Sequence, residues 1–279
     1  MKLLKNLNTE NYNNVDFILN YLKDNQIIEN EYQEPIEYFH CYWKGTLSDL
    51  HLLSLQSLIK THTNAQIILW TPNIFELNGS ISSIKIRKQL KDNLEINEID
   101  KNLFNNANAE HLYSKYQLLS SQKDQTSLAY SSDIIRFVIL QVYGGLWFDL
   151  DILFLRNLNS IKIKRYVSQW GTNNCGNAAI LRLEKGHNLI NYINNNYDQP
   201  FYPTTTFKLE NKLDITILPS TFFDILWRPN EQIPSHIQFK TFDDFFNVKE
   251  LNLPNEIYTY HWHNRWNNNI PPFFNQTIL

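Results

Sequence analysis

Two aspartates, Asp149 and Asp151, stand one residue apart within the apolar stretch LWFDLDILFL. We expect this stretch to form a buried strand. Side chains alternate faces along a strand, so both carboxylates should point the same way while Leu150 points into the core. Holding two like charges together in an apolar setting is costly unless a cation neutralises them, and oxygen ligands favour Mg²⁺ or Mn²⁺. The pair therefore predicts a divalent-metal site.

A second polar pair precedes these aspartates. Asp133 and Arg136 lie one helical turn apart in SSDIIRFVILQVY, residues 131–143, which we predict to be a helix that is apolar almost all round and ends at a Gly-Gly pair. Two interpretations are open. In one, Ser132 caps the helix and Arg136 only pairs with Asp133. In the other, both charged side chains stay polar because they hydrogen-bond the hydroxyls of a ligand in a cleft.

The rest of the sequence predicts the strands and helices that position these four charged residues. Residues 36–43 and 65–70 are predicted strands on either side of a helix from about Ser48 to His62, which gives a strand, helix, strand unit. Further helices are expected near 82–91 and 109–119. After the aspartates, RYVSQW and AAILRL are predicted strands and GHNLINYINNNY a helix. Strands and helices thus alternate, as in an α/β fold.

Composition limits the class of protein. With 279 residues, 43% of them hydrophobic, the chain can bury one substantial core. We expect a helical extension at residues 1–30, based on the helical spacing in 11–23, and a single catalytic domain at 31–279. The net charge of −3 provides no basic field for nucleic acid, which we therefore exclude as a partner.

The sequence also bears on location. Its two cysteines have no metal-binding or disulfide spacing, and neither a signal peptide nor an apolar stretch of transmembrane length is recognisable. We expect a cytoplasmic protein without a transmembrane segment, and peripheral contact with a membrane is compatible with this.

A long motif links the two polar pairs. It reads S-D-x-x-R-x-x-x-L-x-x-x-G-G-x-x-x-D-x-D and comprises Ser132, Asp133, Arg136, Leu140, Gly144, Gly145, Asp149 and Asp151. This motif resembles the D-x-D region of glycosyltransferase family 32 and of the catalytic domains of large clostridial glucosylating toxins. The resemblance implies the GT-A fold, with a mixed central sheet flanked by helices. It also implies a retaining transferase that uses a UDP-sugar and Mn²⁺ or Mg²⁺.

Two other stretches are similar to the same family. FHCYWKG, residues 39–45, looks like its first strand, so that Trp43 would stack on the donor's uracil, and a core aromatic is the alternative for Trp43. NCGNAAILRLEKGH, residues 174–187, places Asn177 near the donor sugar or acceptor. A buried amide that satisfies a loop is the alternative for Asn177.

YHWHNRW, residues 260–266, is similar to the family's closing loop, H-H-W-x-G-S-W. The resemblance brings His261 to the metal or diphosphate and the Trp266 indole N–H to the β-phosphate. Tyr260, Asn264 and Arg265 replace a histidine, a glycine and a serine, so the geometry of this loop departs from the pattern. The Arg265 charge would act on the leaving diphosphate in place of the lost hydroxyl, while His263 is either a ligand or a solvated bystander.

These assignments give a metal-dependent retaining enzyme that transfers a hexose from a UDP-sugar to a glycan, either a polysaccharide or a lipid-linked oligosaccharide. The expected catalytic residues are Asp133, Arg136, Asp149, Asp151 and Asn177. The expected UDP-sugar contacts are Trp43, Asp133, Arg136, Asp149, Arg265 and Trp266. The expected metal ligands are Asp149, Asp151 and His261.

Three alternatives remain. A protein acceptor would make the chain an effector or toxin-like transferase that is secreted into a host cell. A metallohydrolase would use Asp149, Asp151, His261 and His263 to cleave a phosphodiester, but it would have no need of Trp43 together with Asp133 and Arg136. A catalytically dead binding module is disfavoured because both carboxylates of the D-x-D pair are present.

Overall fold

The computed structural model describes residues 35–78, 88, 90, 92–170, 175–187, 189–196, 206–208, 213–224 and 257–262. The expected extension at 1–30 lies outside these residues, as do His263, Asn264, Arg265 and Trp266. Most of the helix expected at 82–91 lies outside them too.

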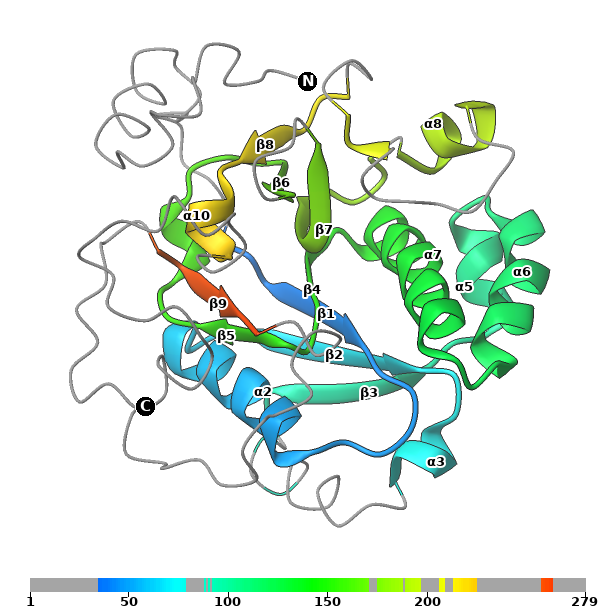
Figure 1. Ribbon diagram of the computed structural model, residues 1–279, viewed down its shortest axis with the longest axis horizontal. Coiled ribbons are helices and arrows are strands. Elements are labelled where there is room, and N and C mark those ends of the chain that lie inside the picture. Colours follow the sequence, from blue (N-terminus) through cyan, green and yellow to red (C-terminus); the bar gives the residue numbers. More distant parts are fainter. Residues whose placement is uncertain are drawn as a thin grey trace.

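A seven-stranded mixed sheet forms the centre of the fold, in the order β3-β2-β1-β4-β7-β6-β8 (Figure 1). Its strands are β1 (Tyr38–Tyr42), β2 (Gln66–Thr71), β3 (Leu94–Glu98), β4 (Gly145–Phe148), β6 (Tyr166–Gln169), β7 (Gly176–Leu183) and β8 (Thr216–Leu218). β1 pairs in parallel with β2 and β4, whereas β7 runs antiparallel between β4 and β6. The expected mixed central sheet is therefore confirmed. β5 (Ile152–Phe154) and β9 (Thr259–His261) form a separate antiparallel pair.

Helices cover both faces of the sheet. The described helices are α2 (Asp49–Thr61), α3 (Ile74–Asn78), α5 (Lys101–Asn106), α6 (Glu110–Ser121), α7 (Gln125–Tyr143), α8 (Leu189–Asn196) and α10 (Ser220–Phe223), with a 3₁₀ turn, η2, at Leu158–Ser160. Alternate residues of β2 divide between two cores: Ile67 and Leu69 pack on the side of α2 and β5, and Ile68 and Trp70 on the side of α7. α5, α6 and α8 lie around α7 (Figure 1).

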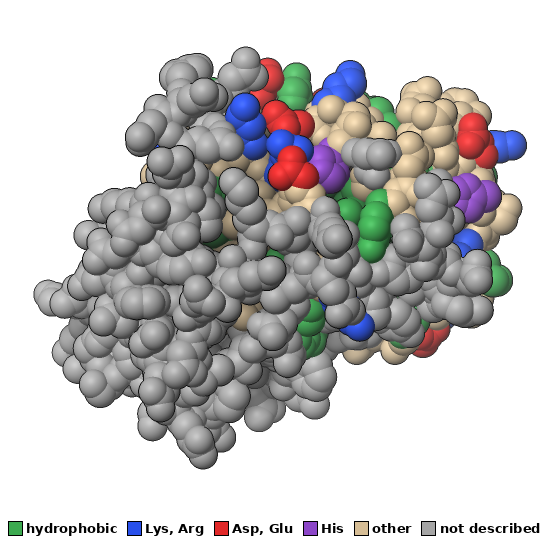
Figure 2. Space-filling model, turned by 90° about the horizontal axis from the view of Figure 1, so that it is seen from above, with side chains coloured by type: hydrophobic (Ala, Val, Ile, Leu, Met, Phe, Trp, Pro, Cys, Tyr) green, Lys and Arg blue, Asp and Glu red, His purple; other side chains and the backbone are tan. Residues whose placement is uncertain are grey.

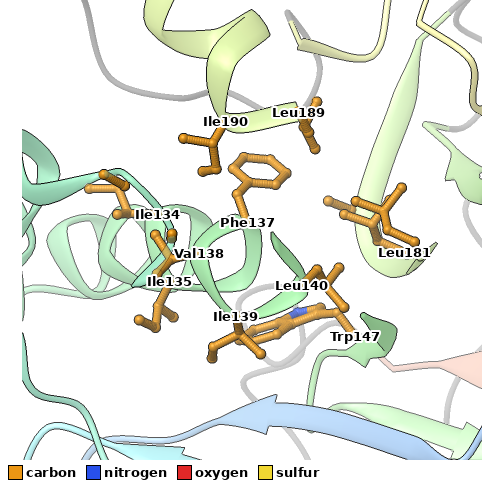
Figure 3. Packing of buried hydrophobic residues seen from close by; sticks show 14 of the residues in the cluster. Ile134, Ile135, Phe137, Val138, Ile139, Leu140, Trp147, Leu181, Leu189 and Ile190 are labelled. Carbon is orange, nitrogen blue, oxygen red and sulfur yellow. The ribbon is translucent and has the colours of Figure 1, made fainter. Parts of the chain in front are cut away.

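α7 is longer than the sequence predicted, because it begins at Gln125 with Asp124 as its N-cap. The Asp124 carboxylate accepts a hydrogen bond from the Ser127 N–H at 2.8 Å. The interpretation of Ser132 as a cap is therefore wrong. Figure 3 shows Phe137 of α7 directed toward Ile190 and Leu189 of α8.

The turn from α7 into β4 is fixed by Gly144 and His40. Gly144 has φ +69°, and a Cβ at this position would come within 2.5 Å of the Lys185 backbone nitrogen. Its carbonyl accepts from His40 Nε2 at 3.0 Å, while His40 Nδ1 accepts from Trp70 Nε1 at 3.2 Å. Burial lowers the pKa of His40 to about 4, against the opposing effect of its hydrogen bond to Gly144. A neutral histidine thus joins this turn to the sheet.

Two surface features bear on possible partners. No helix in the described part of the chain is long and apolar enough to cross a membrane. On the face drawn in Figure 2, acidic and basic side chains lie close together. Among the described residues, Arg165 pairs with Asp214 at 2.7 Å and with Glu184 at 3.4 Å.

Candidate active site

The candidate site lies at the carboxyl ends of β1 and β4. Trp43 directly follows β1, and Asp149 directly follows β4. The two strands are parallel neighbours, and the chain continues from β1 to β2 and β3 on one side and to β4 on the other. Ligands of open α/β sheets bind at such a point, outside the carboxyl ends of the strands. The fold therefore brings Trp43, which we expect to stack on a nucleotide base, and Asp149 to the same edge of the sheet.

The two aspartates do not share a strand, so the prediction of a single continuous strand is wrong. β4 ends at Phe148 and β5 begins at Ile152, with a turn between them that the Ile152 N–H closes on the Asp149 carbonyl at 3.2 Å. The Asp149 N–H still bonds to Ala179 of β7 at 2.9 Å, whereas the Asp151 carbonyl accepts from the Trp262 N–H at 3.1 Å. The chain leaves the main sheet between these two residues, and their side chains meet different partners.

Asp149 faces a buried arginine. Its Oδ1 atom accepts from Trp147 Nε1 at 2.9 Å and lies 3.3 Å from Arg136 Nη2. The same Nη2 atom is 3.0 Å from Asp133, and the Arg136 guanidinium carbon lies 5.3 Å from the centre of the Trp147 ring. Arg136 pairs with Asp133, as one interpretation predicted, and the structure adds the link to Asp149. Burial raises the pKa of Asp149, and the Arg136 charge opposes this.

Asp151 meets His261 of β9. His261 Nε2 lies 3.1 Å from Asp151 Oδ1, and its Nδ1 lies 3.5 Å from Asp224 Oδ2. Burial opposes protonation of this imidazole, but the two carboxylates outweigh burial and hold the pKa of His261 well above its usual range. Asp224 could not be predicted from the sequence, because a single aspartate after STFF belongs to no recognisable spacing.

Trp43 is half-buried and has His51 as a neighbour. Its indole N–H donates to the Thr46 carbonyl at 3.1 Å, and its ring centre lies 3.9 Å from that of His51. His51 Nδ1 accepts from the Ser48 N–H at 2.9 Å at the start of α2. Burial lowers the pKa of His51 to about 4, although the Asp151 charge opposes the shift. His51 is a second residue near the site that the sequence pattern did not single out.

Asn177 lies on β7 and organises the backbone there. Its Oδ1 atom accepts from the Ala179 N–H at 2.9 Å, and its carbonyl accepts from the Ser168 hydroxyl at 2.5 Å, beside a register shift between β6 and β7. Asn177 is half-buried within a strand and is therefore not the buried loop amide of the alternative interpretation, although its amide oxygen does bind the local backbone. Because the Ala179 carbonyl also accepts from the Asp149 N–H, Asn177 supports the D-x-D turn.

The side chains around Asp151 have suitable chemistry for a divalent cation. Carboxylate oxygens together with an imidazole nitrogen suit Mn²⁺, and carboxylates alone suit Mg²⁺. Within the described ranges, no three His, Cys, Asp or Glu side chains are arranged as a ready-made ligand set. A cation between Asp151 and His261 would therefore complete its coordination with substrate phosphates and water, as is common for Mg²⁺.

Comparison with known proteins identifies the matched region. Residues 48–168 match the family described as "Glycosyltransferase sugar-binding region containing DXD motif". This match confirms the expected resemblance over that region, and the mixed central sheet with its flanking helices is the architecture that the resemblance implied. No curated protein matches the chain.

Several solved structures are similar at low identity. The PaToxG glycosyltransferase is 19% identical over 65% of this chain and 66% of that chain, with a TM-score of 0.46. The UDP-bound glycosyltransferase domain from the YGT toxin is 14% identical over 56% of this chain and 60% of that one, with a TM-score of 0.38. The galactosyltransferase LgtC, in complex with donor and acceptor sugar analogs, is 11% identical over 66% and 74%, with a TM-score of 0.37. The matched part of this chain thus spans less than two thirds of the length of the PaToxG and YGT toxin chains.

Proposed function

We propose that this chain transfers a hexose from a UDP-sugar to a glycan acceptor with retention of configuration, using Mn²⁺ or Mg²⁺. The observation that carries the proposal is the 3.1 Å approach of His261 Nε2 to Asp151 Oδ1. It brings a possible nitrogen ligand from the C-terminal part of the chain to the second carboxylate of the D-x-D pair. The match of residues 48–168 to a DXD sugar-binding region supports the same site.

The residues divide into two groups in this proposal. Asp151 and His261 hold the cation, and Asp149 lies beside them as a further ligand or a ribose contact. A cation bound there would neutralise the diphosphate and make UDP a better leaving group. Trp43 stacks on the uracil. Arg265 and Trp266 would contact the diphosphate, although both lie outside the described residues.

Asp133 is the proposed contact to the sugar hydroxyls. Its side chain is 14% exposed, whereas that of Arg136 is 5% exposed and is engaged with both aspartates. We therefore infer that Arg136 acts mainly by holding Asp133 and Asp149 in place. Asn177, through its bond to Ala179, fixes the turn from which Asp149 projects.

The test is donor hydrolysis without an acceptor. The full chain would be incubated with Mn²⁺ and a panel of UDP-sugars, and UDP release would be followed over time. We expect slow release from one or a few UDP-hexoses, and ¹H NMR of the first-formed sugar should show the anomer of the donor. No release from any nucleotide sugar, combined with cleavage of a phosphodiester, would favour the metallohydrolase. Once the donor is known, glycan and protein acceptors can be compared directly.

A further inference from the structure

Asp224 lies on the side of the His261 imidazole that faces away from Asp151. Its Oδ2 atom is 3.5 Å from Nδ1, while Nε2 on the opposite side of the ring is 3.1 Å from Asp151. The side chains of Asp224 and His261 are 6% and 8% exposed. A carboxylate next to Nδ1 favours a proton on that nitrogen and leaves Nε2 as the atom that can coordinate a metal.

The backbone holds Asp224 in this position independently of the ion pair. α10 and the residue before β9 are joined by a hydrogen bond from the Tyr258 N–H to the Phe222 carbonyl at 2.8 Å. A second bond runs from the Thr259 hydroxyl to the Phe223 carbonyl, also at 2.8 Å. Asp224 follows directly and caps α10 through its own N–H, which bonds to the Ser220 carbonyl at 2.6 Å. Capping therefore uses the backbone N–H of Asp224, and its carboxylate approaches His261.

His261 thus has a buried carboxylate on each side of its ring. A protonated His261 would already have a counter-charge in Asp151. Burying another carboxylate carries a desolvation cost of several kcal/mol in general. The arrangement is explained if Asp151 is to be engaged by a cation, because His261 then still needs a fixed orientation.

We propose that Asp224 is a positioning residue of the metal site, which holds the Nδ1–H of His261 so that Nε2 is presented to the cation beside Asp151. This inference rests on the proposed metal role of Asp151 and His261. Carboxylate–histidine–metal arrangements of this kind fix the tautomer and the orientation of the ring, and losing the outer carboxylate typically weakens metal binding 10- to 100-fold.

The experiment measures Mn²⁺ affinity of the full chain in the presence of UDP, by EPR titration of free Mn²⁺. Asp224→Ala should weaken binding about 10- to 100-fold, and Asp224→Asn, which keeps the shape but loses the charge, about 10-fold. Asp214→Asn is the control for the chemical change, because the Asp214 side chain is 82% exposed and pairs with Arg165, and this variant should bind as wild type does. Near-UV circular dichroism would establish that each variant is folded.

A second readout separates positioning from a purely structural role. In ¹⁵N-histidine NMR with Mg²⁺ and UDP, wild-type His261 should carry its proton on Nδ1, and the Asp224 variants should lose this preference. Absence of Mn²⁺ binding by the wild type would overturn the metal site and this proposal together. Loss of binding in His261→Ala, with wild-type affinity and an unchanged tautomer in folded Asp224→Asn, would overturn the positioning role alone.

Discussion

The Arg136 guanidinium lies beside Asp149, with Nη2 3.3 Å from the carboxylate oxygen Oδ1. Because the same nitrogen is 3.0 Å from Asp133, one buried cation connects the expected sugar contact to the first aspartate of the D-x-D turn. The Arg136 residue as a whole is only 4% exposed, so this link lies largely out of water.

Replacing Arg136 with an uncharged residue should lower the stability of the folded protein. In Arg136→Met, two carboxylates lose their shared partner, and breaking a buried ion pair in this way costs on the order of 3 kcal/mol. Urea unfolding of Arg136→Met should therefore give a lower free energy of unfolding than that of the wild type. Adding Asp133→Asn and Asp149→Asn to Arg136→Met should restore part of the lost free energy. Unchanged stability in Arg136→Met would contradict the anchoring role.

Trp43 should contribute more to nucleotide binding than to folding. Trp43→Ala is expected to weaken UDP binding by about 1–3 kcal/mol, the range for stacking of one base on an aromatic side chain. Trp43→Phe keeps an aromatic face and should lose less. Calorimetric titration with UDP checks both variants, and thermal unfolding is the control. A large loss of stability with unchanged UDP affinity would make Trp43 a core residue.

Gly144 offers a test of the turn that leads into β4. Gly144→Ala should destabilise the protein by more than the roughly 1–3 kcal/mol of positive-φ strain, because the added Cβ would also meet the Lys185 backbone at 2.5 Å. Gly186→Ala is the matched control, since Gly186 also has a positive φ, +76°, but nothing lies within 4 Å of its Cβ. Equal loss of stability in the two variants, measured by chemical denaturation, would show that the close approach is unimportant.

Much of the fold could be predicted because its signals are local. The alternation of apolar residues and the Gly-Gly pair were sufficient to predict the strand, helix, strand unit of β1, α2 and β2 and the end of α7. The start of α7 was misplaced because Asp124 caps a polar first turn that has no apolar period. The D-x-D turn was misjudged for a different reason. Whether the chain stays in the main sheet after Asp149 depends on pairing with β9, a long-range contact that no local pattern contains.

The site was predictable only in part for the same reason. Asp133, Arg136, Asp149 and Asp151 belong to one motif, and their spacing indicates a shared site. Asp224 and His51 come from separate elements, and only the tertiary structure brings them to His261 and Trp43. Side chains that support a site but lie outside its motif have no characteristic sequence spacing from which they could be predicted.

The buried histidines predict how stability depends on pH. His40 is fully buried, and burial lowers its pKa to about 4, while an unfolded histidine titrates near 6.5. Between these values the unfolded chain binds a proton that the folded chain does not. The free energy of unfolding should therefore fall as the pH decreases from about 6.5 to 4, by at most about 1.4 kcal/mol per pH unit for each such group.

His62, whose pKa burial also lowers to about 4, adds to this effect with the same sign. The check is urea unfolding of the wild type and His40→Gln at several pH values between 4 and 7.5. The variant should show a shallower loss of stability over the acid range. Identical slopes for the two proteins would contradict a neutral, buried His40.

The metal-dependent nucleotide site is tested most directly by calorimetric titration of UDP into the wild type and Asp151→Ala, each with Mn²⁺ and with a chelator. We predict that the wild type binds UDP far more tightly with Mn²⁺ than with chelator. Asp151→Ala should show the weak, chelator-like affinity under both conditions, with thermal stability unchanged or higher. Equal UDP affinity of the two proteins with Mn²⁺, or full wild-type affinity in the chelator, would contradict the assignment of Asp151 to a metal under the donor's diphosphate.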